Sequence, residues 1–303
     1  IYGGTLRCNS LYWRAEHVVL LMDFSKFTYA KGEPKQDAED AVPGENLPLH
    51  ESEEGGEEAK STTDVSVSPN YQKPEGTLSP ILVFVLSGGE IRERNILKVL
   101  IQQKELHSLR VLFLSEQKQG LQPYQMQEKW QYIRQKKQLE IDGQIYNLYD
   151  IDKVFLLSDV DEFYEQLSKI LSVKAAEDGG CWVISNPCIE IWLYFCYKNE
   201  PKTDLACIEA LPESERSKRL KSLGNEIIKG GFNFNYAFEH LHEGIENSVK
   251  YYEEDEKGIP VIFATGMYKL AKFIVETLET NGNEYKKYIN RKRLERERYC
   301  RKG

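Results

Sequence analysis

Three short apolar runs, each followed by a polar turn and then a helical pattern, constrain the fold of this chain most strongly. The runs cover residues 81–86, 154–157 and 181–184. Runs this short and this uniformly apolar are typical of strands buried on both faces of a parallel sheet. The helical pattern after each run predicts an α/β fold with helices on both faces of the sheet. In such folds, ligands and metal ions bind at the carboxyl ends of the strands.

The remaining sequence pattern fits this architecture. Asp142-Gly143 lies between two alternating segments and indicates a hairpin with a type I′ turn. Pro123 suits the first position of a helix, and after Pro201 the pattern is helical throughout. We expect strands at 81–86, 109–114, 153–158 and 181–185, a hairpin at 139–146, and helices at 91–105, 123–137, 161–173, 203–210, 213–229, 235–253 and 266–279.

Composition suggests four zones along the chain. Residues 1–30 form an N-terminal segment whose structure the sequence leaves undefined. Residues 31–79 are rich in Glu, Asp, Gly, Pro and Ser and bury too little apolar surface to fold, which predicts an acidic disordered linker. We expect the α/β core at 80–200 and a helical C-terminal region at 201–303 that packs on it.

Charge and cysteine content narrow the class of protein. The chain has 303 residues, 41% of them hydrophobic, and a formal net charge of −8, which argues against a generally basic, nucleic-acid-coating surface but permits a locally basic groove. No apolar run is long enough to span a membrane, and we see no signal peptide. The six cysteines show no CxxC spacing, so we expect reduced, buried thiols and a cytoplasmic protein.

Two aspartates follow the second apolar run. Asp159 and Asp161 are two residues apart, so in an extended backbone their side chains point the same way. Two carboxylates on one side form a hard oxygen site suited to Mg²⁺ or Mn²⁺. A second interpretation stays open, in which either aspartate only caps the following helix.

A single acidic residue interrupts the apolar helix predicted after the third run. Asn186 suits an N-cap and Pro187 the first turn, which puts Glu190 near the strand ends on an otherwise apolar helix. A carboxylate on a helix that is otherwise buried needs a reason. Glu190 is therefore a candidate metal ligand or general base, and the alternative is that it completes a capping arrangement.

Glycines and basic residues offer phosphate contacts. Gly88-Gly89 after the first run lets a backbone approach a phosphate, although a plain tight turn explains it as well. Lys218, Arg219 and Lys221, together with the basic tail at 291–301, can neutralise nucleic-acid phosphates. Interspersed glutamates make a solvated helix face the alternative for the tail.

The segment Ser-Asn-Pro-Cys-Ile-Glu-Ile-Trp-Leu at residues 185–193 resembles the "SNPCFELWLL" box of the RloB-like family. In that family the box also lies downstream of a strand that ends in Asp-x-Asp, as Asp159-Val160-Asp161 does here. The resemblance spans residues 81–278. It implies a relative of the Toprim domain, whose members hold magnesium with a strand-end Glu and an Asp-x-Asp for phosphodiester chemistry. RloB-like proteins are encoded in restriction and phage-defence loci, often beside an ATPase partner.

The resemblance implies roles for particular residues. Asp159 and Asp161 would be metal ligands, and Asn186 and Glu190 would line the cleft. The family's Glu at the end of the first strand is absent, so Glu90 or Glu93 would have to reach back into the site. Cys196 also stands where the family commonly has a histidine.

These features together predict a Toprim-like, magnesium-dependent nuclease that acts on DNA or RNA in an anti-phage defence or restriction-associated system. Glu190, Glu90 or Glu93 would act as general base or third ligand. The alternative is a catalytically inactive adaptor that binds nucleic acid or the partner ATPase. The oligomeric state is not predicted.

Overall fold

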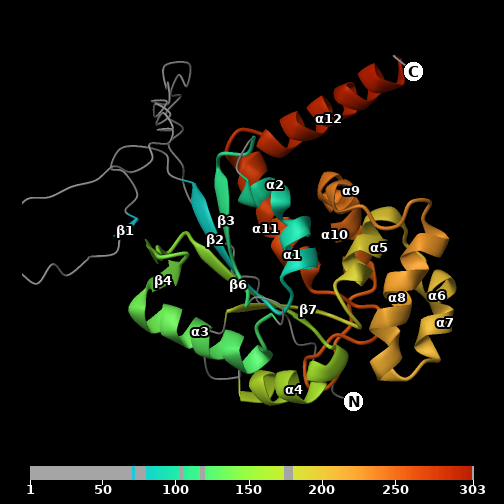
Figure 1. Cartoon of the computed structure of the whole chain (residues 1–303), viewed down its shortest axis with the longest axis horizontal. Coiled ribbons are helices and arrows are strands. Elements are labelled where there is room, and N and C mark those ends of the chain that lie inside the picture. The colour runs from blue at the N-terminus through green and yellow to red at the C-terminus, as the bar shows by residue number, and fades with distance from the viewer. Residues whose placement is uncertain (1–69, 72–79, 103–104, 117–119, 174–179, 302–303) are drawn as a thin grey trace, which may run out of the picture. The chain divides into compact units, whose positions relative to one another are not determined.

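The computed structural model describes residues 70–71, 80–102, 105–116, 120–173 and 180–301. The N-terminal segment at 1–30 and nearly all of the predicted linker lie outside the described residues. Within Asp64–Gly303, which cluster as one unit, a parallel sheet is flanked by helices, and further helices follow in the C-terminal region (Figure 1).

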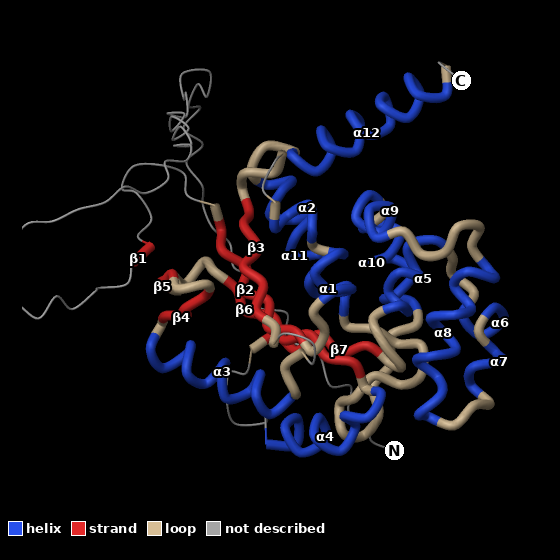
Figure 2. The backbone as a smooth tube through the Cα atoms, viewed as in Figure 1, coloured by secondary structure: helices blue, strands red, loops and turns tan. Residues whose placement is uncertain are grey.

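Four strands form the main sheet in the order β3 (Leu109–Leu114), β2 (Ile81–Ser87), β6 (Lys153–Asp159) and β7 (Cys181–Ser185). All neighbouring pairs are parallel, with Val85 opposite both Phe113 and Phe155. Because the strands are parallel, the carboxyl ends of β2, β6 and β7 meet at one edge (Figure 2).

The two faces of this sheet are covered by different helices. Val83 and Val85 pack into a core with α1 (Ile91–Ile96), α2 (Lys98–Ile101) and α11 (Met267–Thr280). The alternate residues Leu82, Phe84 and Leu86 face the other way, because successive strand side chains point to opposite faces. They pack with side chains of α3 (Pro123–Lys136) and α4 (Tyr164–Val173). The α/β class with helices on both faces is thus confirmed.

Local boundaries differ from prediction at two helices of the α/β core. The helix predicted at 91–105 ends at Ile96, and a second short helix begins at Lys98; the break is at Leu97 (φ −95°, ψ 3°), which together with Ile96 and Leu100 remains buried. The helix predicted at 161–173 begins as the 3₁₀ turn η2 (Asp161–Phe163).

The predicted hairpin forms from β4 (Gln138–Ile141) and β5 (Gln144–Asn147). Asp142 (φ 52°) and Gly143 (φ 74°) both have positive φ, as a type I′ turn requires. Residues Asn70–Tyr71 form the short strand β1, which pairs in parallel with β5. The prediction that 31–79 lacks regular structure is wrong at these two residues, because β5 had an unpaired backbone edge to offer.

The C-terminal half is helical, as predicted, but the helices predicted at 203–210 and 235–253 are each divided into two, at Leu205 and at His240. Helix α5 (Glu190–Tyr197) follows β7 and packs against α10 (Leu241–Lys250). Gly244 permits this contact, since a Cβ atom there would lie 2.8 Å from both the Cys196 sulfur and the Trp192 ring. The other helices are α6 (Pro201–Asp204), α7 (Ala206–Glu209), α8 (Glu213–Ile227), α9 (Phe234–Glu239) and α12 (Glu284–Cys300).

The structure bears on two expectations, one about membrane-spanning segments and one about the burial of cysteines. Among the described residues, no helix is long and apolar enough to cross a membrane. Cys188 and Cys196 are buried free thiols, but Cys207 and Cys300 are exposed, so the expectation of uniformly buried cysteines is wrong at these two helix surfaces.

Substitutions at Gly120 and Gly143 test how closely the loop before α3 packs against the turn after β2. Both have positive φ (72° and 74°), but a Cβ at Gly120 would lie 1.7 Å from the Gly88 carbonyl oxygen, whereas one at Gly143 meets nothing within 4 Å. We expect Gly143→Ala to lower the free energy of unfolding by about 1 kcal/mol through backbone strain alone. Gly120→Ala should cost at least about 1 kcal/mol more, since backbone atoms must move. Urea unfolding of both variants measures the difference, and equal losses would contradict the close packing.

Candidate active site

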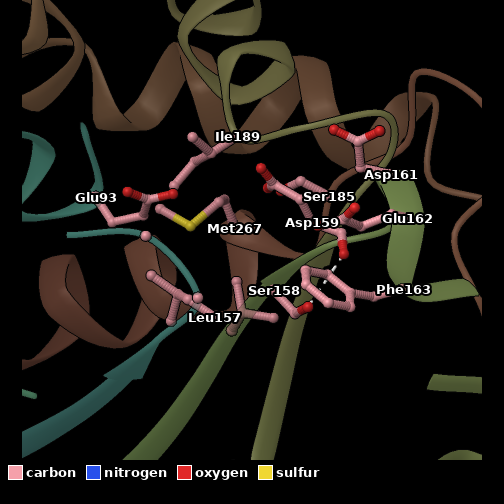
Figure 3. A pocket seen from close by; sticks show the side chains of 13 residues that line it. Glu93, Leu157, Ser158, Asp159, Asp161, Glu162, Phe163, Ser185, Ile189 and Met267 are labelled. Carbon is pink, nitrogen blue, oxygen red and sulfur yellow. Dashed lines mark hydrogen bonds between the residues drawn. The ribbon is translucent and has the colours of Figure 1, made fainter. Parts of the chain in front are cut away.

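A pocket opens at the carboxyl edge of the sheet (Figure 3). Its walls come from the turn after β2, the end of β6 with η2, the end of β7, and the first residue of α11. Figure 3 shows Glu93 on one side of the pocket and Asp159 and Asp161 on the other. The lining residues are Gly88, Gly89, Glu93, Leu157, Ser158, Asp159, Asp161, Glu162, Phe163, Val183, Ser185, Ile189 and Met267.

Backbone hydrogen bonds continue beyond the strands and join the three strand ends. The Gly88 N–H donates to the Leu157 carbonyl (2.9 Å), and the Val160 N–H donates to the Ser185 carbonyl (2.9 Å). The Asp161 N–H donates to the Pro187 carbonyl (3.3 Å). These bonds hold the turn after β2, the Asp-x-Asp segment and the box segment at one edge, as the parallel topology predicts.

Asp159 and Asp161 both line the pocket, but for a different reason than predicted. The strand ends at Asp159, and Val160 is helical (φ −72°, ψ −53°), so the aspartates do not share an extended backbone. Neither caps the following helix through its side chain, since η2 has no side-chain cap. The Asp159 carboxylate instead accepts a hydrogen bond from the backbone N–H of Ile189, just before α5.

Glu93, one of the two alternatives for the missing strand-end carboxylate, reaches the pocket. Its side chain is buried, and its carboxylate lies so close to Gly89 that a Cβ there would be 2.0 Å from Oε2. Gly89 therefore has to be glycine for Glu93 to occupy this position. Glu90 precedes α1, is partly exposed, and is not among the residues that line the pocket.

Two carboxyl groups of the pocket, those of Asp159 and Glu93, have raised pKa values. Burial raises the pKa of Asp159 well above its ordinary value, and the neighbouring negative charge of Glu93 raises it further. Burial also raises the pKa of Glu93. The positive charge of Lys221 opposes both shifts. Two carboxyl groups with raised pKa in one cleft are typical of functional sites.

Glu190 lies in a different environment from the predicted one. Its side chain is only 2% exposed and forms an ion pair with Arg92 of α1, whose side chain is 44% exposed. Neither residue is among those that line the pocket. The pair joins the first turn of α5 to α1, the helix that carries Glu93.

Asn186 has contacts that explain its position without a role in the pocket. Its backbone N–H donates to the Ala264 carbonyl (2.9 Å), its carbonyl accepts from the Phe263 N–H (2.9 Å), and its side-chain amide donates to the Pro260 carbonyl (2.8 Å). It is not an N-cap, because α5 begins only at Glu190 and Ile189 occupies the N-cap position. The predicted helix start was therefore wrong by several residues.

The donor set suits a hard cation bound with few protein ligands. Among the described residues, no three His, Cys, Asp or Glu side chains converge closely enough to hold a metal ion by themselves. Mg²⁺ usually keeps several waters and binds one or two carboxylates together with substrate phosphates. Asp159 and Asp161 fit that limited role, and Glu93 lies in the same pocket.

Two residues at this edge, Met267 and Thr265, carry no signal that sequence analysis could use. Met267, at the start of α11, closes the pocket although it lies more than one hundred positions after Asp161 in the chain. Ser185 is held by a hydrogen bond between its hydroxyl and that of Thr265 (2.8 Å). Only the three-dimensional fold brings Met267 and Thr265 to the strand ends.

Comparison with known proteins adds no assignment, since no family model, curated protein or solved structure matches the chain.

The raised pKa of Asp159 predicts an unusual pH dependence of stability. A carboxyl group whose pKa is higher in the folded than in the unfolded state lowers the free energy of unfolding as pH rises from the unfolded pKa through the folded one. Asp159→Asn removes this loss. We therefore expect a higher free energy of unfolding than in wild type at pH 7, and a smaller difference between the two proteins at pH 4. The exposed Asp150 provides a control, and Asp150→Asn should follow the wild-type curve. Urea unfolding between pH 4 and 8 measures the three curves. A variant less stable than wild type at pH 7 would contradict the account.

The Arg92–Glu190 ion pair predicts a second stability effect. Arg92→Met leaves the buried Glu190 carboxylate without its partner, and we expect a loss of about 2 kcal/mol, less than for a fully buried pair because water reaches Arg92. Adding Glu190→Gln should recover most of that loss, since a neutral amide is cheaper to bury. Thermal and urea unfolding of the single and double variants test this. Additive losses would show that the two side chains do not interact.

Proposed function

We propose that this pocket binds a divalent cation and hydrolyses phosphodiester bonds in DNA or RNA. One observation carries the proposal: Glu93 of α1, Asp159 at the end of β6 and Asp161 of η2 line one pocket at the carboxyl edge of a parallel sheet. Three carboxylates in one cleft destabilise the empty site and become favourable when a cation neutralises them.

The resemblance of residues 185–193 to the RloB-like box supports the same function. In the Toprim relatives that it implies, a Glu after the first core strand and an Asp-x-Asp after a later one serve together. Glu93 after β2 and Asp159 and Asp161 after β6 match that order, with Glu93 in place of the missing strand-end residue. The Toprim-like fold, the anti-phage or restriction-associated context and an ATPase partner belong to this proposal through the resemblance, and the cytoplasmic location belongs to it through the cysteine pattern.

The residues divide the chemistry between them. Asp159 and Asp161 would hold Mg²⁺ or Mn²⁺, which supplies positive charge against the negative charge that develops on the phosphate during attack. Asp159 is oriented by the Ile189 N–H. Glu93, whose pKa burial raises, would accept the proton of the attacking water, since a base works best when its pKa lies near the working pH. Gly88-Gly89 leaves room for a phosphate to approach the backbone.

Glu190 and Asn186 have supporting roles in this proposal. The Arg92–Glu190 pair ties α1 to α5 and so helps to position Glu93, which is adjacent to Arg92 in sequence. Asn186 holds the loop at 260–264 behind Ser185. Glu90 has no role in the proposed chemistry.

Asp161→Asn tests the function directly. The substitution removes a ligand charge while nearly preserving shape, so we expect at least a 100-fold loss of Mg²⁺-dependent cleavage of DNA or RNA, in line with the loss of a metal-site group. Affinity for Mg²⁺ or Mn²⁺, measured by calorimetric titration, should fall at least tenfold. Stability without metal should be unchanged or slightly raised. Asp150→Asn, the exposed control, should match wild type in all three measurements.

Equal metal affinity in wild type and Asp161→Asn would contradict the proposal. The alternative, a non-catalytic adaptor that binds nucleic acid or an ATPase, would then explain the chain better.

A further inference from the structure

Lys221 is a basic residue of the helical region that lies beside the pocket. It is on α8, which packs against η2, the turn that contains Asp161. One helical turn earlier, on the same face, the buried Ser217 lies beside the Cys188 thiol. Cys188 immediately precedes Ile189, which lines the pocket. The face of α8 that carries Ser217 and Lys221 therefore lies beside η2 and the segment that leads into α5, at the side of the pocket and not among its lining residues.

The positive charge of Lys221 acts on both walls of the pocket. It opposes the effect of burial on the pKa of Glu93 and of Asp159, which come from different elements on opposite sides of the cleft. Its side chain is partly exposed, and among the described residues it forms no ion pair. Arg219 on the same helix differs, because Glu226 holds it through bonds of 2.6 and 3.0 Å. The Lys221 ammonium is thus close to the carboxylates without being bound by one of them.

Charge balance indicates what this ammonium is for. Three ionised carboxylates and one divalent cation leave a net negative charge in the pocket, and that charge would repel a phosphodiester. One further positive charge cancels it. A lysine ammonium is a compact point charge that commonly binds phosphate oxygens.

We propose that Lys221 is the phosphate-binding residue of this pocket, and that the helical region thereby completes a site whose other groups come from the α/β core. This inference rests on the proposed function for the presence of the cation. The ligand class is a phosphate group with at least one free non-bridging oxygen, held between the ammonium and the carboxylate-bound ion.

Substitution of Lys221 should affect Mg²⁺ affinity and phosphate affinity differently, and this difference distinguishes a phosphate-binding role from a structural one. In the full chain, Lys221→Gln should weaken the binding of inorganic phosphate in the presence of Mg²⁺ at least tenfold. The same variant should bind Mg²⁺ alone as tightly as wild type or more tightly, because a positive charge near the carboxylates is gone. Lys221→Arg should retain most of the phosphate affinity. Lys218→Gln, which removes an exposed lysine from the same helix, is the matched control and should change neither affinity.

Calorimetric titration measures both ligands, and selective acetylation provides a measurement on the unaltered chain. Phosphate with Mg²⁺ should protect Lys221, but not Lys218, from acetylation detected by mass spectrometry. Unchanged phosphate affinity in Lys221→Gln, loss of both ligands together, or acetylation of Lys221 at the same rate with and without phosphate would each overturn the inference. If cleavage and Mg²⁺ binding persist while Lys221→Gln binds phosphate normally, only this inference fails. If wild type binds no Mg²⁺, the proposed function fails, and phosphate binding that depends on Lys221 would still support the residue's role.

Discussion

The parallel pairing of β2, β6 and β7 is the constraint on which the candidate site depends. Their hydrogen bonds extend past the strands, from Gly88 to Leu157 and from Val160 to Ser185, and so bring three turns that are distant in sequence to one edge. Without that pairing, Glu93 and Asp159 would have no reason to be neighbours. The chemistry proposed for the pocket is therefore a consequence of strand order.

The pocket keeps its carboxyl groups at a cost to stability. Burial raises the pKa of both Glu93 and Asp159, which means that the empty folded state disfavours their ionised forms. Other interactions hold these groups in place. The Ile189 N–H donates a hydrogen bond to Asp159, and the Arg92–Glu190 ion pair lies next to Glu93 in sequence. A cation, with a phosphate at Lys221, would relieve the repulsion that the protein alone tolerates.

Local patterns predicted the elements well and the site only in part. The runs at 109–114 and 181–185 became β3 and β7 with the expected bounds, because a short apolar run between turn residues has few alternatives. Asp142-Gly143 predicted its turn for the same reason. The start of α5 was mispredicted, since the three contacts of Asn186 are all with residues 260–264, which no local pattern reveals.

The same limit applies to individual site residues. Spacing identified Asp159 and Asp161, but the choice between Glu90 and Glu93 required the turn at Gly89. Glu190 was expected in the cleft because a carboxylate on an apolar helix needs a partner, and the partner is Arg92, supplied by another element. Lys221 was one of several basic residues in sequence. The packing of α8 against η2 sets it apart from the basic tail, and on α8 itself Arg219 is held by Glu226 and Lys218 is exposed.

A crystal structure of the full chain grown with Mn²⁺ tests the central claim most directly. Anomalous scattering locates the ion without reference to any assumed site. We predict a Mn²⁺ peak in the pocket within about 2.2 Å of a carboxylate oxygen of Asp159 or Asp161, with water completing its coordination. A pocket that remains without the ion at saturating Mn²⁺, or an ion bound only elsewhere on the molecule, would contradict the account.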